Sequence, residues 1–162
     1  MRSATITVTM LGLALLGLGL GACAPQSVPL VLRFPSTETF LVTQSLRIRV
    51  FDDELGCASL VNAVTNGTDL TGSVADVGGL TPCAVRSGVS VPDVGPGQHA
   101  FLVEGLDAMG NVTILAGCAR HEVFAGAQIE VDLYPTTNYD AEYHRAPPDN
   151  VPLDQYCGGG GL

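Results

Sequence analysis

Strict alternation of apolar and polar residues is the feature that most constrains the fold of this chain. In Ser45-Leu-Arg-Ile-Arg-Val50 the apolar residues occupy every second position, and Gln128-Ile-Glu-Val-Asp-Leu133 repeats the pattern. A period of two puts apolar side chains on one face of a β-strand and polar side chains on the other. We therefore predict two strands, each with one face toward a core and the other, carrying Arg47 and Arg49 in the first strand, toward water.

Apolar runs bounded by turn residues predict further strands. Gly110 in Asp107-Ala-Met-Gly-Asn111 can take the left-handed conformation that closes a hairpin, and Asp93-Val-Gly-Pro-Gly97 marks another reversal. The polar stretch from Asn62 to Pro82 has little periodicity and is expected to be a surface loop, with a short helix at Ala58–Val64 as an option. The other strands are expected at Val28–Phe34, Ala84–Val91, Ala100–Leu106, Val112–Cys118 and His121–Phe124. About seven short strands separated by turns are typical of an all-β sandwich or a partly open barrel.

One hairpin carries a family resemblance. The segment Gly97-Gln-His-Ala-Phe-Leu-Val-Glu-Gly-Leu-Asp-Ala-Met-Gly-Asn-Val112 resembles the late hairpin of bacterial Ig-like and fibronectin-III-like domains, in which a strand enters an Asp-x-x-Gly-Asn turn and returns. The resemblance implies an Ig-like antiparallel β-sandwich. The chain has no Trp, so it departs from the Cys-Trp-Cys core of antibody domains. Any antiparallel hairpin with a good turn is the other interpretation.

The first 22 residues have the parts of a secretory signal. A single charge, Arg2, precedes an apolar run from Met10 to Leu20 that is short for a membrane-spanning helix. Leu20-Gly21-Ala22-Cys23 resembles the lipobox of bacterial lipoproteins, in which the signal is cut before the cysteine and the cysteine is acylated. The resemblance implies a signal peptide at 1–22 and a membrane anchor at Cys23, and Ala24 after the cysteine implies sorting to the outer membrane.

The remaining chain divides into three predicted parts. These are a lipidated tether at 23–27, a β-sandwich domain at 28–134 and a C-terminal tail at 135–162. A domain of this size buries roughly two-thirds of its unfolded surface, which is enough for one two-layer core. The tail is rich in Pro, Asp and Tyr and ends in four glycines after Cys157, so it is expected to be disordered.

Four cysteines remain once Cys23 is assigned to the lipid. An even number in an exported chain predicts two disulfides among Cys57, Cys83, Cys118 and Cys157, with three possible pairings. We favour Cys57–Cys83, which would pin the irregular segment, together with Cys118–Cys157, which would tie the tail to the last hairpin.

Two metal sites are weaker hypotheses. Acidic loops at one end of a sandwich can supply oxygen ligands for Ca²⁺, although the sequence has no Asp-x-Asp-x-Asp-Gly loop. The candidate ligands are Asp52, Asp53, Glu54, Asp107 and Asn111. For zinc, Cys118 and His121 have a tolerable spacing, and His99 and His144 are the only other histidines. The bland alternatives, which we favour, are a solvated acidic loop and a disulfide-bonded cysteine, so no cofactor is predicted.

Composition excludes several functions. All seven basic residues are arginine, against sixteen Asp and Glu, which gives a net charge of −9. Without lysine there is no P-loop lysine, Schiff-base lysine or Ser-Lys dyad. The negative charge argues against nucleic acid as a partner. There is no Gly-x-Ser-x-Gly elbow, and the three histidines stand in unrelated settings, so we predict that the protein is not an enzyme.

These observations predict a non-catalytic, membrane-anchored envelope lipoprotein that acts as a structural or partner-binding module. Its expected partners are the membrane, through Cys23, and an envelope protein or glycan. The expected location is the outer membrane, facing either the periplasm or the cell surface. The alternative is a small envelope enzyme, or a carrier of a ligand or calcium, with an unrecognised loop site. A deep polar pocket near Asp52, Asp107 or His99 would favour this alternative.

Overall fold

The computed structural model describes residues 24–108, 112–140 and 156–157. The predicted signal peptide, the lipidation position Cys23 and the possible calcium ligand Asn111 lie outside the described residues. So do Gly110 of the hairpin turn, His144 and most of the C-terminal tail.

Strands alternate with short helices over residues 26–94, and the strands between residues 97 and 135 then follow one another directly. The connections are short, so the elements follow one another closely. In chain order the elements are β1 (Gln26–Arg33), α1 (Thr37–Val42), β2 (Ser45–Asp52), α2 (Cys57–Thr65), β3 (Ala75–Leu80), α3 (Pro82–Arg86), β4 (Val89–Val94), β5 (Gly97–Leu106), β6 (Thr113–Val123), β7 (Ile129–Asp132) and β8 (Tyr134–Pro135).

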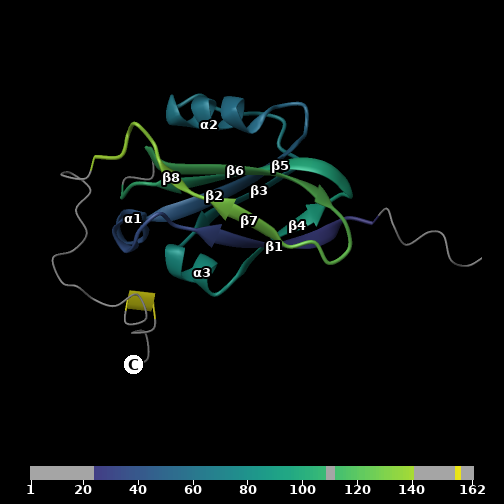
Figure 1. The fold of residues 1–162 in the computed structure, drawn as a ribbon, viewed down its shortest axis with the longest axis horizontal. Coiled ribbons are helices and arrows are strands. Elements are labelled where there is room, and N and C mark those ends of the chain that lie inside the picture. Colours follow the sequence, from purple (N-terminus) through teal and green to yellow (C-terminus); the bar gives the residue numbers. More distant parts are fainter. Residues whose placement is uncertain (1–23, 109–111, 141–155, 158–162) are drawn as a thin grey trace, which may run out of the picture.

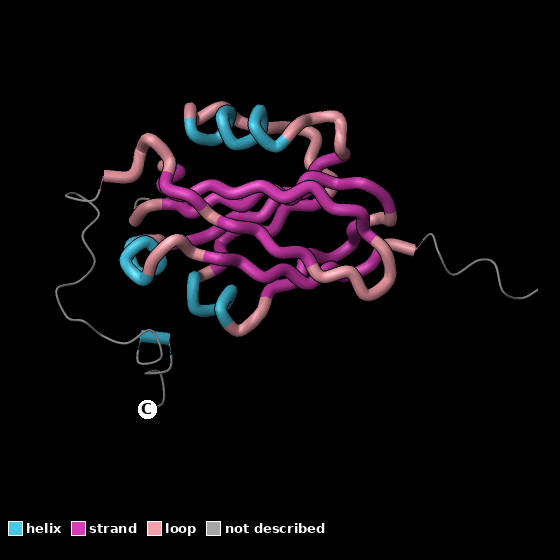
Figure 2. The backbone as a smooth tube through the Cα atoms, in the orientation of Figure 1, coloured by secondary structure: helices cyan, strands magenta, loops and turns pink. Residues whose placement is uncertain are grey.

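The strands form two sheets that pack face to face, which confirms the predicted β-sandwich. One sheet has three strands in the order β4-β1-β7, and the other has five in the order β3-β2-β5-β6-β8. Figure 2 shows the two layers of strands one above the other, with helices outside them. In Figure 1, α2 covers the outer face of the five-stranded sheet, while α1 and α3 lie near the three-stranded sheet.

One strand pair departs from the expected antiparallel arrangement. β7 runs parallel to β1, with Leu30 opposite Ile129, and the chain then crosses at Leu133 to pair β8 with β6 in the other sheet. The crossing brings the backbone of β7 against the inner face of β6. A Cβ atom at Gly117 would collide with the carbonyl oxygen of Asp132, so this position requires glycine.

The predicted period of two is confirmed on the inner faces of the sheets. Leu46, Ile48 and Val50 of β2 are completely buried, as are Ile129 and Val131 of β7. These residues belong to one apolar cluster that fills the space between the sheets. Burial of apolar area from both inner faces is the main source of stability in such a sandwich.

The outer face of β2 is only partly exposed to water, as the Arg47 side chain is 40% exposed and Arg49 is not. Arg49 is only 2% exposed, because α2 and the segment after it cover this side of the five-stranded sheet. Leu60 and Val64 of α2 pack there against Phe51 and Leu102. The pattern of β2 therefore predicted the strand but not the second layer that buries its polar side.

Several boundaries differ from the predicted ones for local reasons. The predicted strand Ala84–Val91 begins instead as α3, because the Thr81 side chain caps the helix and Pro82 occupies its first turn. The predicted strands Val112–Cys118 and His121–Phe124 form one continuous strand, β6. The polar stretch also holds a strand, β3, in addition to the end of α2.

The strand registers define two ends of the sandwich. At the first end, which we call the N-terminal end, Gln26 of β1 pairs with Val94 of β4, and Gly97 of β5 pairs with Val123 of β6. β1 then runs to the opposite, far end, where it leads into α1. Eight residues of strand span about 26 Å, so this is the approximate distance between the two ends.

Candidate functional site

The possible calcium ligands that the structure describes do not all lie at one end of the sandwich. Asp52 pairs with His99 at the N-terminal end, whereas Asp107 follows Leu106, which pairs with Ser45 at the far end. Asp53 and Glu54 directly follow Asp52 and so lie far from Asp107. Across residues 24–108, 112–140 and 156–157, no group of three or more His, Cys, Asp or Glu side chains is arranged to hold a metal ion.

The acidic residues after β2 have structural contacts instead. Asp53 makes a two-pronged ion pair with Arg120 of β6, and these hydrogen bonds hold the pKa of the Asp53 carboxyl below its usual range. Asp52 Oδ1 lies 3.4 Å from Nδ1 of the buried His99, whose Nε2 is 3.0 Å from the carbonyl oxygen of Gly95. Because a carbonyl only accepts, Nε2 donates this hydrogen bond. These contacts tie three strands together at the N-terminal end.

Asp107 acts at the far end as a turn residue. Its Oδ1 lies 3.4 Å from the backbone N–H of Val112, and its own N–H donates to the Val112 carbonyl at 3.1 Å. The side chain is 7% exposed. Asp107 therefore closes the β5–β6 hairpin that the sequence predicted at this place.

The four cysteines form two disulfides, but the pairing we favoured is wrong. Cys57 pairs with Cys118, with Cα atoms 5.4 Å apart, and Cys83 pairs with Cys157, with Cα atoms 5.2 Å apart. α2 lies on β6, so Cys57 at its first turn meets Cys118 and is held far from Cys83 in α3. The pairing of Cys118 also removes it from the zinc set suggested by its spacing to His121.

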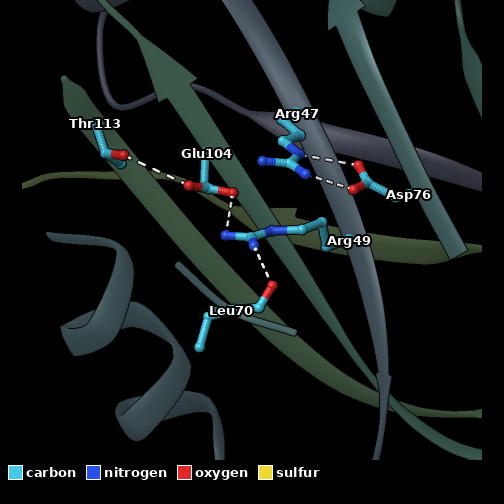
Figure 3. Close-up of polar contacts among 6 residues, drawn as sticks. All are labelled: Arg47, Arg49, Leu70, Asp76, Glu104 and Thr113. Carbon is cyan, nitrogen blue, oxygen red and sulfur yellow. Dashed lines mark hydrogen bonds and ion pairs between the residues drawn. The ribbon is translucent and has the colours of Figure 1, made fainter. Parts of the chain in front are cut away.

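A polar cluster occupies part of the outer face of the five-stranded sheet (Figure 3). Arg49 Nη2 lies 2.7 Å from Glu104 Oε2, and both side chains are over 90% buried. Arg49 also donates to the carbonyl of Leu70 at 3.2 Å, and Thr113 lies 3.5 Å from Glu104. Loss of either partner of such a pair would leave the other charge buried without compensation, so each residue depends on the other.

A second ion pair beside this cluster is more exposed. Arg47 Nε lies 3.0 Å from Asp76 Oδ1, and its Nη2 lies 2.6 Å from Oδ2. The hydrogen bonds from Arg47 lower the pKa of Asp76. Each arginine of the two pairs is matched by a carboxylate, Arg49 by Glu104 and Arg47 by Asp76, so we assign both pairs a structural role.

An apolar groove at the far end is the best candidate for a binding site. It has a volume of about 290 Å³ and lies between the end of β1, α1 and α3. Phe40 and Val85, which are 4% and 6% exposed, form its floor, and the half-buried Leu32 and Phe34 form a wall. Arg86 and the exposed Ser36 and Thr37 stand at the rim. Apolar hollows with a few polar groups at the edge are typical of ligand and partner sites.

Local contacts hold the groove in shape. Ser36 caps α1 reciprocally with Thr39, with hydrogen bonds of 3.1 Å in both directions. The Phe34 and Phe40 rings meet edge to face with centroids 5.0 Å apart, and Tyr156 meets Phe40 at 6.5 Å. The neighbouring Cys157 is linked to Cys83 of α3. The groove is therefore framed by a cap, an aromatic cluster and a disulfide.

A second hollow, of about 420 Å³, lies on the other side of the molecule, between α2 and the β6–β8 edge. It is wider and more open than the groove at the far end. Its lining includes Val61 and Asn62 of α2, Gly117 of β6 and the exposed Tyr134. Neither hollow is lined by Asp52, His99 or Asp107.

Sequence reasoning missed the groove at the far end. Its aromatic wall comes from Phe34 and Phe40, which lie on either side of a capped turn, and from Tyr156 at the other end of the chain. The one available signal was the Ser36-x-x-Thr39 spacing, which is close to a capping box and marks the start of α1.

Comparison with known proteins gives no family for the chain. No protein-family model, no curated protein and no solved structure matches it.

Within the described ranges, the helices are all too short or too polar to cross a bilayer. The two disulfides fit a non-cytoplasmic, oxidising compartment.

Proposed function

We propose that this protein is a non-catalytic envelope lipoprotein, held in a membrane by acyl chains on Cys23, whose β-sandwich binds a partner. The observation that carries the proposal is the lipobox resemblance of Leu20-Gly21-Ala22-Cys23 together with the start of β1 at Gln26. Two residues separate the cysteine from the first strand, so an anchored domain would stand directly on the membrane. Ala24 supports sorting to the outer membrane.

The energetics of lipid insertion fit such an anchor. Each buried CH₂ contributes about 0.8 kcal/mol, and two or more chains give stable attachment. Removal of residues 1–22 also removes Arg2, which leaves six arginines against sixteen acidic residues, a balance of −10. The mature domain would then be strongly acidic, with its membrane affinity concentrated in the lipid.

The shape of the domain supports partner binding over catalysis. The space between the sheets is filled by apolar side chains, and the two hollows are open surface features. Two of the polar groups that a hydrolase or metalloenzyme could use have structural contacts: His99 Nε2 bonds to the Gly95 carbonyl, and Asp53 pairs with Arg120. A small enzyme or ligand carrier is the second candidate, and the apolar groove is the observation that favours a carrier.

Metabolic labelling with radioactive palmitate tests the anchor. We expect Cys23→Ala to abolish label incorporation and to release the protein from membranes. The matched control is the double variant Cys57→Ala/Cys118→Ala, which removes two other cysteines and should keep both the label and the membrane association. Membrane retention of the Cys23→Ala variant, or label that persists in it, would contradict the proposal.

A further inference from the structure

The apolar groove and the start of β1, next to the proposed lipid anchor, lie at opposite ends of the domain, and this sets the direction in which the groove faces. β1 starts at Gln26 at the N-terminal end and runs to the far end, where Phe34, α1 and α3 form the groove. If the domain is anchored through Cys23, the N-terminal end lies at the membrane and the groove opens about 26 Å above it. The groove would therefore face away from the bilayer.

The size and lining of the groove indicate what can enter it. Its volume of about 290 Å³ is roughly twice that of an apolar cavity that holds one benzene ring. Phe40 and Val85 form a buried floor, so an entering group meets apolar atoms on several sides. Most of the lining is apolar, and its polar groups, Ser36, Thr37 and Arg86, stand at the rim, so the groove offers apolar contacts and not the many hydrogen bonds that hold a sugar ring. An aromatic or long aliphatic side chain fits this chemistry.

The charge of the protein surface indicates which residues should flank that side chain in the partner. Arg33, Arg47, Arg49 and Arg120 form ion pairs with carboxylates, and Arg86 also has an interaction partner. The described surface therefore presents an excess of carboxylates, among them the exposed Glu38 in the first turn of α1, next to the rim residue Thr37. A basic segment complements this surface, and an acidic one is repelled.

We propose that the groove between α1, α3 and the end of β1 docks an apolar side chain carried by a basic segment of another envelope protein. The inference rests on the proposed partner-binding function and names the surface and the class of partner. The arrangement is that of an interface anchor, in which one large side chain fills a preformed pocket and charged neighbours set the orientation.

Site-specific photo-crosslinking in cells tests this inference. The photoreactive residue p-benzoylphenylalanine replaces Thr37 at the groove rim in one strain and the similarly exposed Asn62 in the second hollow in a matched control strain. We expect a protein adduct of discrete mass from position 37, at least fivefold more abundant than any from position 62. Peptide mapping should place the crosslink in a segment with an apolar residue flanked by Lys or Arg.

A charge reversal at the rim adds a second measurement. Glu38→Lys on the exposed face of α1 should reduce the adduct from position 37 several-fold and lower the thermal unfolding temperature only slightly, by the small amount that a lost carboxylate costs in the first turn of a helix. No adduct, equal adducts at both positions, a glycan or lipid adduct, or a crosslink within this chain would each overturn the inference. Palmitate labelling of Cys23 is measured in the same cells, so a failure of docking is distinguished from a failure of the anchor.

Discussion

The two helical covers of the sandwich make a useful comparison. α2 lies flat on the five-stranded sheet, where Leu60 and Val64 pack on Phe51 and Leu102, and the Cys57–Cys118 disulfide fastens it to β6. α1 and α3 lie at the far end and leave an apolar groove between them. There the disulfide fastens Cys157, beside Tyr156, to α3.

α2 is a structural cover, whereas α1 and α3 border a candidate binding surface. α2 and the following segment bury a charged pair, Arg49–Glu104, that the sheet could not otherwise keep from water. α1 and α3 instead leave apolar atoms of Phe34 and Leu32 partly exposed, which costs stability unless something binds there. The two disulfides close loops of similar length, yet one fastens α2 to the sheet and the other joins α3, beside the groove, to Cys157.

Removing each disulfide gives the largest expected effect. The cysteines are 61 and 74 residues apart, so Cys57→Ala/Cys118→Ala and Cys83→Ala/Cys157→Ala should each lower the free energy of unfolding by about 4 kcal/mol. Denaturant unfolding followed by circular dichroism measures the loss. Under conditions in which both variants stay folded, only the second should lose the crosslink from position 37. Equal loss of the crosslink in both variants would show that the groove does not depend specifically on the Cys83–Cys157 disulfide.

Breaking the buried Arg49–Glu104 pair should lower the free energy of unfolding somewhat less than the loss of a disulfide does. Glu104→Gln leaves the Arg49 charge buried without a compensating carboxylate, and we expect a loss of about 3 kcal/mol. The double variant Arg49→Met/Glu104→Leu should recover most of it, because no charge is then left buried. A loss under about 1 kcal/mol in Glu104→Gln would mean that water reaches this site and that the cover is not closed.

Truncating one apolar residue under each cover compares their packing directly. Leu60→Ala, at a side chain 1% exposed, should lower the free energy of unfolding by about 2–3 kcal/mol. Phe34→Ala, at the half-buried wall of the groove, should cost about 1 kcal/mol, because part of the ring already contacts water. Thermal melts of the two variants provide the test. A larger loss at Phe34 would show that the groove is part of the core.

The exposed ion pair beside the buried one should have the smallest effect, and it depends on pH. Arg47 lowers the pKa of Asp76, so the pair stabilises the fold above the carboxyl's unfolded pKa. This contribution is lost as the pH falls through the lowered folded pKa. Because the Asp76 side chain is 36% exposed, we expect less than about 1 kcal/mol.

The measurement is a pair of melting curves against pH. Asp76→Asn should be less stable than the unchanged protein at pH 6, and the difference should shrink below about pH 4. A difference that stays constant from pH 6 to pH 3 would show that the loss comes from packing and not from charge.

The inner layer of this fold was predictable from sequence, and the outer layer was not. Alternation in β2 and β7 identified both strands, and the Asp107–Asn111 turn identified the β5–β6 hairpin. The burial of Arg49 was not predictable, because it depends on how α2 and the segment after it fold back over the sheet, where the Leu70 carbonyl meets Arg49. Local alternation shows which residues of β2 share a face, but tertiary packing decides whether that face is exposed or buried.

Long-range geometry also explains the errors in the candidate sites. The disulfide pairing depends on where α2 and α3 lie, and sequence spacing alone does not specify this. Asp52 ends β2 and Asp107 follows β5, but the two strands are antiparallel, so their carboxyl ends point in opposite directions. The groove combines residues 32–40, 85–86 and a neighbour at 156, and the sequence carries no local pattern that joins them.

Energy transfer to the membrane measures how the two ends of the domain are oriented relative to it. The lipidated protein is reconstituted in nanodiscs with an acceptor dye on the lipid headgroups, and a donor is placed at Thr37 in one sample and at the exposed Phe124 of the β6–β7 connection in another. If Cys23 anchors the domain, we expect efficient energy transfer from the donor at position 124. Transfer from position 37 should be much weaker, because that position lies about 26 Å farther from the bilayer. Equal transfer from the two positions, or stronger transfer from position 37, would contradict this orientation.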